Sequence, residues 1–150
     1  MFWNTLALHA AQNHNNMDQT QTRYDFTFKS WTVKELTLEK TNWDSDLFYD
    51  VKQEWRFLKE LTGITADIII TAATDANNIE GSKIARLRLS CELGASGLTN
   101  EIPKELFGQI GLILLNTARG VLLQAGAGGI LARKTVPMYT VEQLSGQPQA

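Results

Sequence analysis

Residues 103–125 read PKELFGQIGLILLNTARGVLLQA, and they predict a long helix that is apolar on almost every side. A surface helix normally shows one apolar stripe, whereas a helix that is apolar all round must be covered on several sides. Pro103 suits the first turn of a helix, and Glu105 is favourable near its positive end. A small domain has few ways to cover such a helix alone. The remaining cover must come from other subunits, a bound hydrophobic ligand or a membrane.

A membrane is the least favoured of these covers. A spanning helix needs about 20 predominantly apolar residues, but the uninterrupted apolar run extends only from Gly111 to Leu115. Gln109, Asn116 and Arg119 interrupt its surroundings, and an arginine in the middle of a membrane is costly. We therefore expect no stable membrane insertion.

The residues at the start of the structured region predict a strand with bulges. Residues 24–28 alternate, with aromatic side chains at the even positions. The apolar parity then changes twice before residue 38. A one-residue slip moves side chains to the other face of a sheet, so these changes predict bulges or a strand covered on both faces. We expect the first bulge at Lys29–Ser30.

Three further strands are expected before the helix. Residues 47–61 fit a strand or a helix, and we interpret them as a strand. Residues 67–74 are rich in β-branched side chains, which favours a strand, and the turn residues of 75–82 predict a hairpin. Residues 83–95 alternate between a packed and a wet face, as antiparallel sheets do. The packed face holds Leu87, Leu89, Cys91 and Leu93, and the wet face holds Arg86, Arg88, Ser90 and Glu92.

This order of elements predicts an α+β fold. We expect a four-stranded antiparallel sheet, then the long helix, then a short C-terminal helix through residues 141–144. The domain should span residues 24–145. Residues 1–23, with a stretch rich in Asn, Gln and Thr, should form a disordered leader, and residues 146–150 a flexible tail.

Composition narrows the class of protein. The 150 residues suit one domain, and the formal net charge is −2 without a run of Lys and Arg. Nucleic-acid binding relies largely on neutralising phosphates, so we expect no nucleic-acid partner. The single cysteine, Cys91, fits a reducing compartment and predicts a cytoplasmic protein.

Nothing in the sequence favours catalysis. Glu35 and Glu39 lie four residues apart on a predicted strand, about 13 Å from each other, which is too far for a paired acid and base. Gly126–Gly129 lacks the lysine and Ser/Thr of a phosphate-binding loop and follows a helix, so it is better interpreted as a hinge. We expect no enzyme activity, no cofactor and no metal site.

Several strings, in order, resemble the SecB family of protein-export chaperones. Residues 26–39 resemble the opening strand of that family, and residues 89–97 its fourth strand. Leu106-Phe107, Arg119-Gly120 and Pro137 followed by Leu144 are similar to its helix–loop–helix landmarks. The resemblance covers about residues 24–145. The chain departs from it at residues 108–111, which lack the Pro-Tyr-Ala-Arg string, in the second strand, and in having no long acidic C-terminal end.

The resemblance implies an ATP-independent holdase that assembles as a homotetramer, a dimer of dimers with the long helices between sheets. Such a protein binds unfolded precursor proteins in hydrophobic grooves and delivers them to the SecA ATPase. The implied SecA-docking acids are Glu35, Glu39 and Glu92. The candidate client groove comprises Trp31, Leu106, Phe107, Ile110, Leu114, Val136, Met138 and Tyr139. The candidate subunit interface comprises Cys91, Leu93, Leu112 and Leu115.

Two other functions remain open. A related chaperone of a toxin–antitoxin pair would use the same grooves to protect an antitoxin. A carrier of a hydrophobic ligand, or a hot-dog-like enzyme, would instead hold an acyl chain in the crevice between the helix and the sheet.

Overall fold

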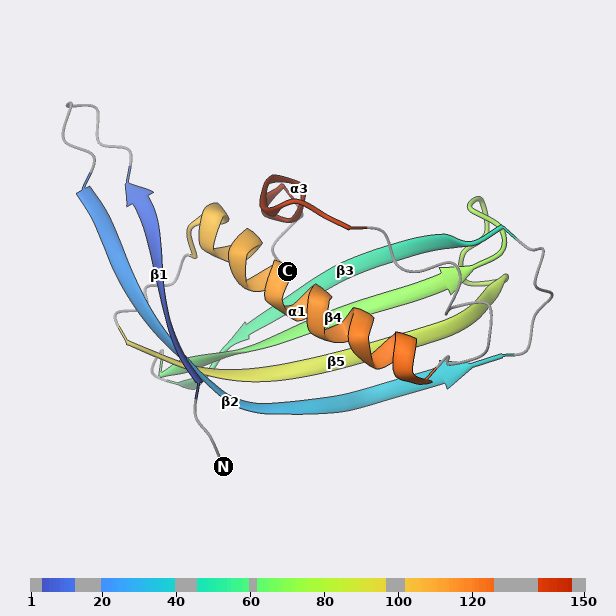
Figure 1. The fold of residues 1–150 in the computed structure, drawn as a ribbon, viewed down its shortest axis with the longest axis horizontal. Helices are drawn as coiled ribbons and strands as arrows, with labels where there is room; N and C mark the ends of the chain where they lie inside the picture. The colour runs from blue at the N-terminus through green and yellow to red at the C-terminus, as the bar shows by residue number, and fades with distance from the viewer. Residues whose placement is uncertain are drawn as a thin grey trace.

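The computed structural model describes residues 4–12, 20–39, 46–59, 62–96, 102–125 and 138–146. Five antiparallel strands form one sheet in the order β1-β2-β5-β4-β3, and the long helix α1 crosses one face of it (Figure 1). The short helix α3 packs against α1. The elements are β1 Asn4–Gln12, β2 Thr20–Leu38, β3 Phe48–Phe57, β4 Gly63–Ala73, β5 Lys83–Ser96, α1 Lys104–Ala125 and α3 Val141–Ser145.

The predicted α+β fold is confirmed: β2, β3, β4 and β5 are followed by a long and a short helix. Strand β1 differs from the expected disordered leader, because Asn4–Gln12 pairs with residues 20–28 of β2. Residues 20–24 extend beyond the last pair between β2 and β5, which is Asp25 with Ser96. Backbone groups in a strand need hydrogen-bond partners, and β1 supplies them there.

Two bulges in β2 explain both changes of apolar parity. The register with β5 shifts between Phe28 and Ser30 and again between Val33 and Glu35. The extra residues are Lys29 and Lys34, so the bulge expected at Lys29–Ser30 is confirmed. Each bulge inserts one residue and restores the previous face. The apolar residues of β2 therefore stay on one face of the sheet. They are Phe26, Phe28, Trp31, Val33, Leu36 and Leu38, each paired with an odd-numbered residue of β5.

That face, called the inner face here, packs against α1 and holds the core. The predicted packed face of β5 is confirmed, since all four of its apolar residues are buried. They pair with Ile64, Ala66, Ile68 and Ile70 of β4. From the helix, Leu106, Phe107, Ile110, Leu114 and Leu115 are fully buried in the same cluster, as is Leu144 of α3.

The contact between α1 and β3 is especially close. The Trp55 ring lies 4.9 Å from the Phe107 ring, and Trp55 Nε1 donates a hydrogen bond to Gln53 Oε1 at 3.0 Å. A Cβ added at Gly111 would lie 2.5 Å from Gln53 Nε2. A glycine fits here without displacing the buried Gln53 side chain, which any larger residue would have to move.

Helix α1 is also long and apolar enough to cross a membrane by length and composition. Half of its most apolar window is buried inside the protein. The core helix of a soluble protein passes the same test, so α1 is weak evidence for a membrane span.

Candidate functional site

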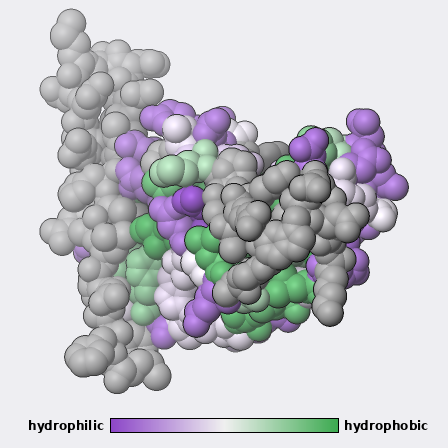
Figure 2. Space-filling view, turned by 45° about the vertical axis from the view of Figure 1, so that its right-hand side comes forward, coloured by the Kyte–Doolittle hydropathy of each residue, from purple (hydrophilic) through white to green (hydrophobic). Residues whose placement is uncertain are grey.

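A row of apolar side chains on the second half of β2 is left uncovered. Trp31, Val33, Leu36 and Leu38 lie on the inner face and are 38%, 47%, 40% and 42% exposed. We call these four residues the β2 row. Trp31 stacks on Phe28 with 5.6 Å between ring centroids, which fixes one end of the row. Figure 2 shows hydrophobic side chains exposed among hydrophilic ones on one side of the molecule.

The backbone edge beside the β2 row is also open. Strand β1 pairs with β2 only as far as Phe28, and β5 occupies the opposite edge. Among the described strands, none pairs with the edge from Ser30 to Leu38. Lysines and bulges are typical means of protecting such an edge from added strands, and Lys29 and Lys34 combine the two. The β2 row therefore offers its side chains to a partner more readily than its backbone.

The other predicted groove residues lie elsewhere. Leu106, Phe107, Ile110 and Leu114 are fully buried between α1 and the sheet, so their assignment to a surface groove is wrong for this chain. They belong to the core because the sheet itself covers this side of the helix. Met138 is 81% exposed and Tyr139 is half-buried against the core. Val136 lies outside the described residues.

The predicted subunit interface is also corrected. Cys91, Leu93 and Leu115 are fully buried within the single chain, where they fill the space between β5 and α1. A side chain enclosed in this way has no surface left for another subunit. Leu112, on α1, is half-buried. Burial, together with the nearby charge of Glu92, raises the pKa of the Cys91 thiol to about 12, so the thiol is an inert core group.

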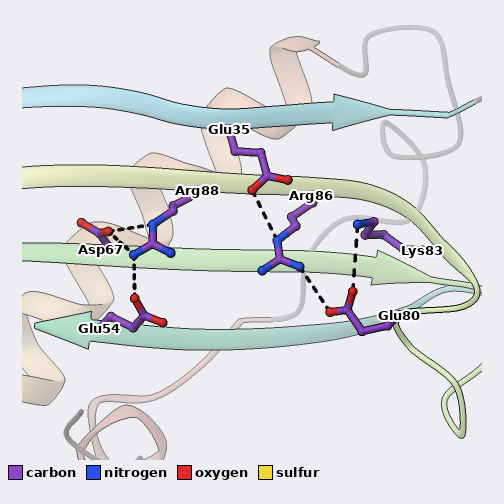
Figure 3. Close-up of polar contacts among 7 residues, drawn as sticks. All are labelled: Glu35, Glu54, Asp67, Glu80, Lys83, Arg86 and Arg88. Carbon is purple, nitrogen blue, oxygen red and sulfur yellow. Dashed lines mark hydrogen bonds and ion pairs between the residues drawn. The ribbon is translucent and has the colours of Figure 1, made fainter.

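The opposite face of the sheet, called the outer face here, carries charged side chains from β2 to β3. At its centre, Arg88 Nε and Nη2 bind Asp67 Oδ2 at 2.8 and 2.7 Å, and Nη2 binds Glu54 Oε2 at 2.6 Å (Figure 3). The Asp67 side chain is only 2% exposed. The hydrogen bond to Asp67 is the main reason that the pKa of Arg88 is raised. This cluster links three neighbouring strands through charge-assisted hydrogen bonds.

A second cluster involves one of the predicted docking acids. Arg86 lies between Glu35 and Glu80, with Nε 3.6 Å from Glu35 Oε2 and Nη1 3.2 Å from Glu80 Oε1 (Figure 3). Lys83 Nζ is 4.0 Å from Glu80 Oε2. The charge of Glu35 is therefore largely balanced by a neighbour of its own chain.

The remaining docking acids lie at different places. Glu92 is on the outer face, paired with Ser30 of β2 and Thr65 of β4. Glu39 is exposed just after β2, and its backbone N–H donates to Ile84 O at 2.7 Å. No described residue forms an ion pair with either carboxylate. Because arginines and lysines alternate with the acids, the outer face is mixed in charge and not uniformly acidic.

Sequence reasoning missed a hollow of about 450 Å³ on the outer face. Hydroxyl side chains form much of its lining: they are Ser30, Thr32, Thr65 and Ser90. The charged residues Lys34, Arg56 and Glu92 and the apolar residues Phe57 and Leu58 complete it. In the sequence, the hollow is indicated only by Ser90, a small residue that follows Arg86 and Arg88 on the predicted wet face of residues 83–95. Only the strand order shows that small residues of three strands meet there.

In the part of the chain that the structure describes, no group of three or more His, Cys, Asp and Glu side chains is placed to hold a metal ion.

No protein-family model matches the sequence, and no curated protein matches it either. Membership of the SecB family therefore stays a prediction from the strings that suggested it.

Proposed function

We propose that this protein is an ATP-independent chaperone of the SecB type, a holdase that binds unfolded precursor proteins through the β2 row. The observation that carries this proposal is the exposure of four large apolar side chains along one strand. Contiguous apolar surface of this kind marks interaction sites in soluble proteins. From Trp31 to Leu38 the row advances six residues along the paired strand β5, or about 20 Å, enough for an extended client segment of about six residues.

Such a function needs an exposed apolar binding surface and no catalytic residues. A holdase acts by binding the non-native state of its client, which lowers the concentration of the aggregating species. One row gives weak binding, because the four side chains are already half-covered by their neighbours. In a homotetramer, a dimer of dimers, several rows would hold one client, and the effective concentration would strengthen binding. We propose that assembly for this chain, in the cytoplasm.

Delivery to SecA is part of the same proposal. Glu92 lies on the outer face, opposite the β2 row, and Glu39 directly follows Leu38 at the end of that row; neither has an ion-pair partner among the described residues. A docking partner could therefore contact Glu92 while a client stays on the inner face. Complementary charge would speed the encounter more than it would strengthen the complex.

A carrier of an acyl chain between helix and sheet is less well supported. The crevice is filled by the fully buried side chains of α1, and a Cβ at Gly111 would already overlap Gln53. A ligand in this place would have to separate α1 from the sheet.

Aggregation of a chemically unfolded client, followed by light scattering, tests the proposal with two matched variants. Leu36→Asp places a charge in the β2 row, and Thr37→Asp places the same charge on the outer face of the same strand. We expect wild type and Thr37→Asp to suppress aggregation, and Leu36→Asp to lose most of this activity while keeping its circular dichroism spectrum. Size-exclusion chromatography with light scattering gives the oligomeric state in parallel. A folded monomer that fails to suppress aggregation would refute the proposal.

A further inference from the structure

The hollow on the outer face is lined by small hydroxyl side chains, whereas the rest of this face carries long charged ones. Elsewhere on this face long side chains pair across the strands, as Arg88 does with Asp67 and Glu54. In the hollow, small hydroxyl side chains from three neighbouring strands leave about 450 Å³ open. Small polar residues expose a sheet surface together with hydrogen-bonding groups, so the hollow is suited to a polar ligand.

Glu92 provides the acceptor at the floor of this hollow. It has Ser30 on one side and Thr65 on the other in the cross-strand register. Although Arg56 also lines the hollow, it is directed toward Asp67, with 3.7 Å between Nη2 and Oδ2. No described residue forms an ion pair with Glu92. A half-buried carboxylate beside hydroxyl groups favours a cationic group of a ligand.

Two cations in the lining restrict which cationic ligand can enter. Arg56 lies two strands away from Glu92, which is about 10 Å, and Lys34 lies farther along β2. Both repel a ligand that carries only positive charge, and both attract acidic groups on either side of a single positive one. Like charges that face each other exclude wrong partners as effectively as opposite charges attract the right ones.

We propose that this hollow docks an extended polypeptide segment in which one lysine or arginine is flanked by acidic residues. The basic side chain binds Glu92, and its aliphatic stem packs on Leu58. The acidic residues face Arg56 and Lys34. An extended chain advances about 3.3 Å per residue and directs every second side chain to the same side. An acid four positions from the base therefore enters the hollow with it and, about 13 Å along the chain, comes within reach of Arg56. The inference deepens the docking part of the proposed function, on which it rests.

Fluorescence anisotropy with short synthetic peptides on the full-length protein tests this inference. One peptide has a central lysine with a glutamate four residues to each side in a serine background, which places all three side chains on one face of the extended chain. A second replaces both glutamates with lysine, and a third keeps the composition of the first with the two glutamates adjacent to each other. We expect the first peptide to bind most tightly, by about tenfold over the all-lysine peptide, a factor that corresponds to about one well-placed charge pair.

Variants of the hollow identify the contacts. Glu92→Gln should weaken the first peptide by about tenfold, and Lys34→Gln by about threefold since Lys34 is more exposed. Glu142→Gln removes the same charge as Glu92→Gln, but at an exposed position on α3, and should leave peptide binding unchanged. Circular dichroism confirms that each variant is folded. Equal binding of the three peptides, or unchanged binding to Glu92→Gln, would overturn the inference.

The same preparations separate this inference from the holdase proposal. Aggregation suppression without selective peptide binding refutes the hollow as a docking site and leaves the β2 row unaffected. Selective peptide binding without aggregation suppression supports the hollow and refutes the holdase.

Discussion

Two glycines of α1 offer a matched test of how the helix packs on the sheet. Gly111 faces β3, where a Cβ would lie 2.5, 2.7 and 2.8 Å from the three amide atoms of Gln53. Gly120 is on the exposed side of α1, and a Cβ there would meet nothing within 4 Å. Replacing each with alanine makes the same chemical change in the same helix, so the difference between the two isolates the contact with β3.

The two substitutions should have opposite signs. Alanine is favoured over glycine in a helix interior by about 1 kcal/mol, which is the expected gain for Gly120→Ala. Gly111→Ala receives the same gain but must displace Gln53, which is only 4% exposed and accepts the Trp55 indole N–H. A buried donor left without its acceptor costs about 1–3 kcal/mol, and the tilted contact between Trp55 and Phe107 is disturbed as well. We expect Gly111→Ala to be destabilised by about 1–2 kcal/mol overall.

Urea denaturation followed by circular dichroism at 222 nm measures both free energies of unfolding. The midpoint should rise for Gly120→Ala and fall for Gly111→Ala, with the same slope for both, because neither change alters the surface exposed on unfolding. A double-mutant cycle adds a control: in a Gln53→Ala background, Gly111→Ala should no longer be unfavourable. Equal stabilisation by both alanines would refute the close packing of α1 on β3 at Gln53.

Three further predictions concern the charge cluster, the cysteine and the last helix. Asp67→Asn should lower the free energy of unfolding by about 2–3 kcal/mol, because it leaves half-buried Arg88 without its main partner; urea denaturation measures the loss. The pKa of Cys91 is raised from 9.0 to about 12, so the unfolded chain loses a proton first, and stability should fall by up to about 1.4 kcal/mol per pH unit between pH 9 and 12. Urea denaturation between pH 9 and 12 should show this fall in the free energy of unfolding in the wild type and not in Cys91→Ala. Thr140→Ala removes the capping box of α3 and should cost about 1 kcal/mol, seen as faster proteolysis near fully buried Leu144.

The sequence carried enough information for most of the fold. Alternation identified the packed face of β5, and the turn residues of 75–82 identified the hairpin that joins it to β4. Within the ambiguous segment 47–61, Phe48–Phe57 forms strand β3, in which Tyr49, Val51 and Trp55 face the core with strand parity. Strand β1 was missed since its residues have little β-propensity of their own. Its partner is the part of β2 that β5 leaves unpaired, which is a tertiary effect that no local pattern contains.

The candidate site was harder to predict for a physical reason. Periodicity tells which residues are apolar and which face they share, but not how much of that face another element covers. Leu106 and Trp31 both lie on faces that turn toward the interior, yet the first is fully buried and the second is not. The difference depends on where α1 lies across the sheet. A helix is about 10 Å wide and covers about two strands, so one helix leaves part of a five-stranded sheet bare.

This geometry places much of the exposed apolar surface on a strand. The sheet and α3 bury one side of α1 from Leu106 to Leu122, while Leu123 on the helix stays 38% exposed. Of the large apolar side chains that are exposed among the described residues, four form the β2 row, which the bulges at Lys29 and Lys34 keep on the inner face. The others are Phe48 and Phe57 of β3, Leu123 and Met138. Without those bulges, either Trp31 and Val33 or Leu36 and Leu38 would point to the charged outer face. A chain that inserts two extra residues to keep four exposed apolar side chains together has a surface for binding, and a client or a second subunit should meet it there.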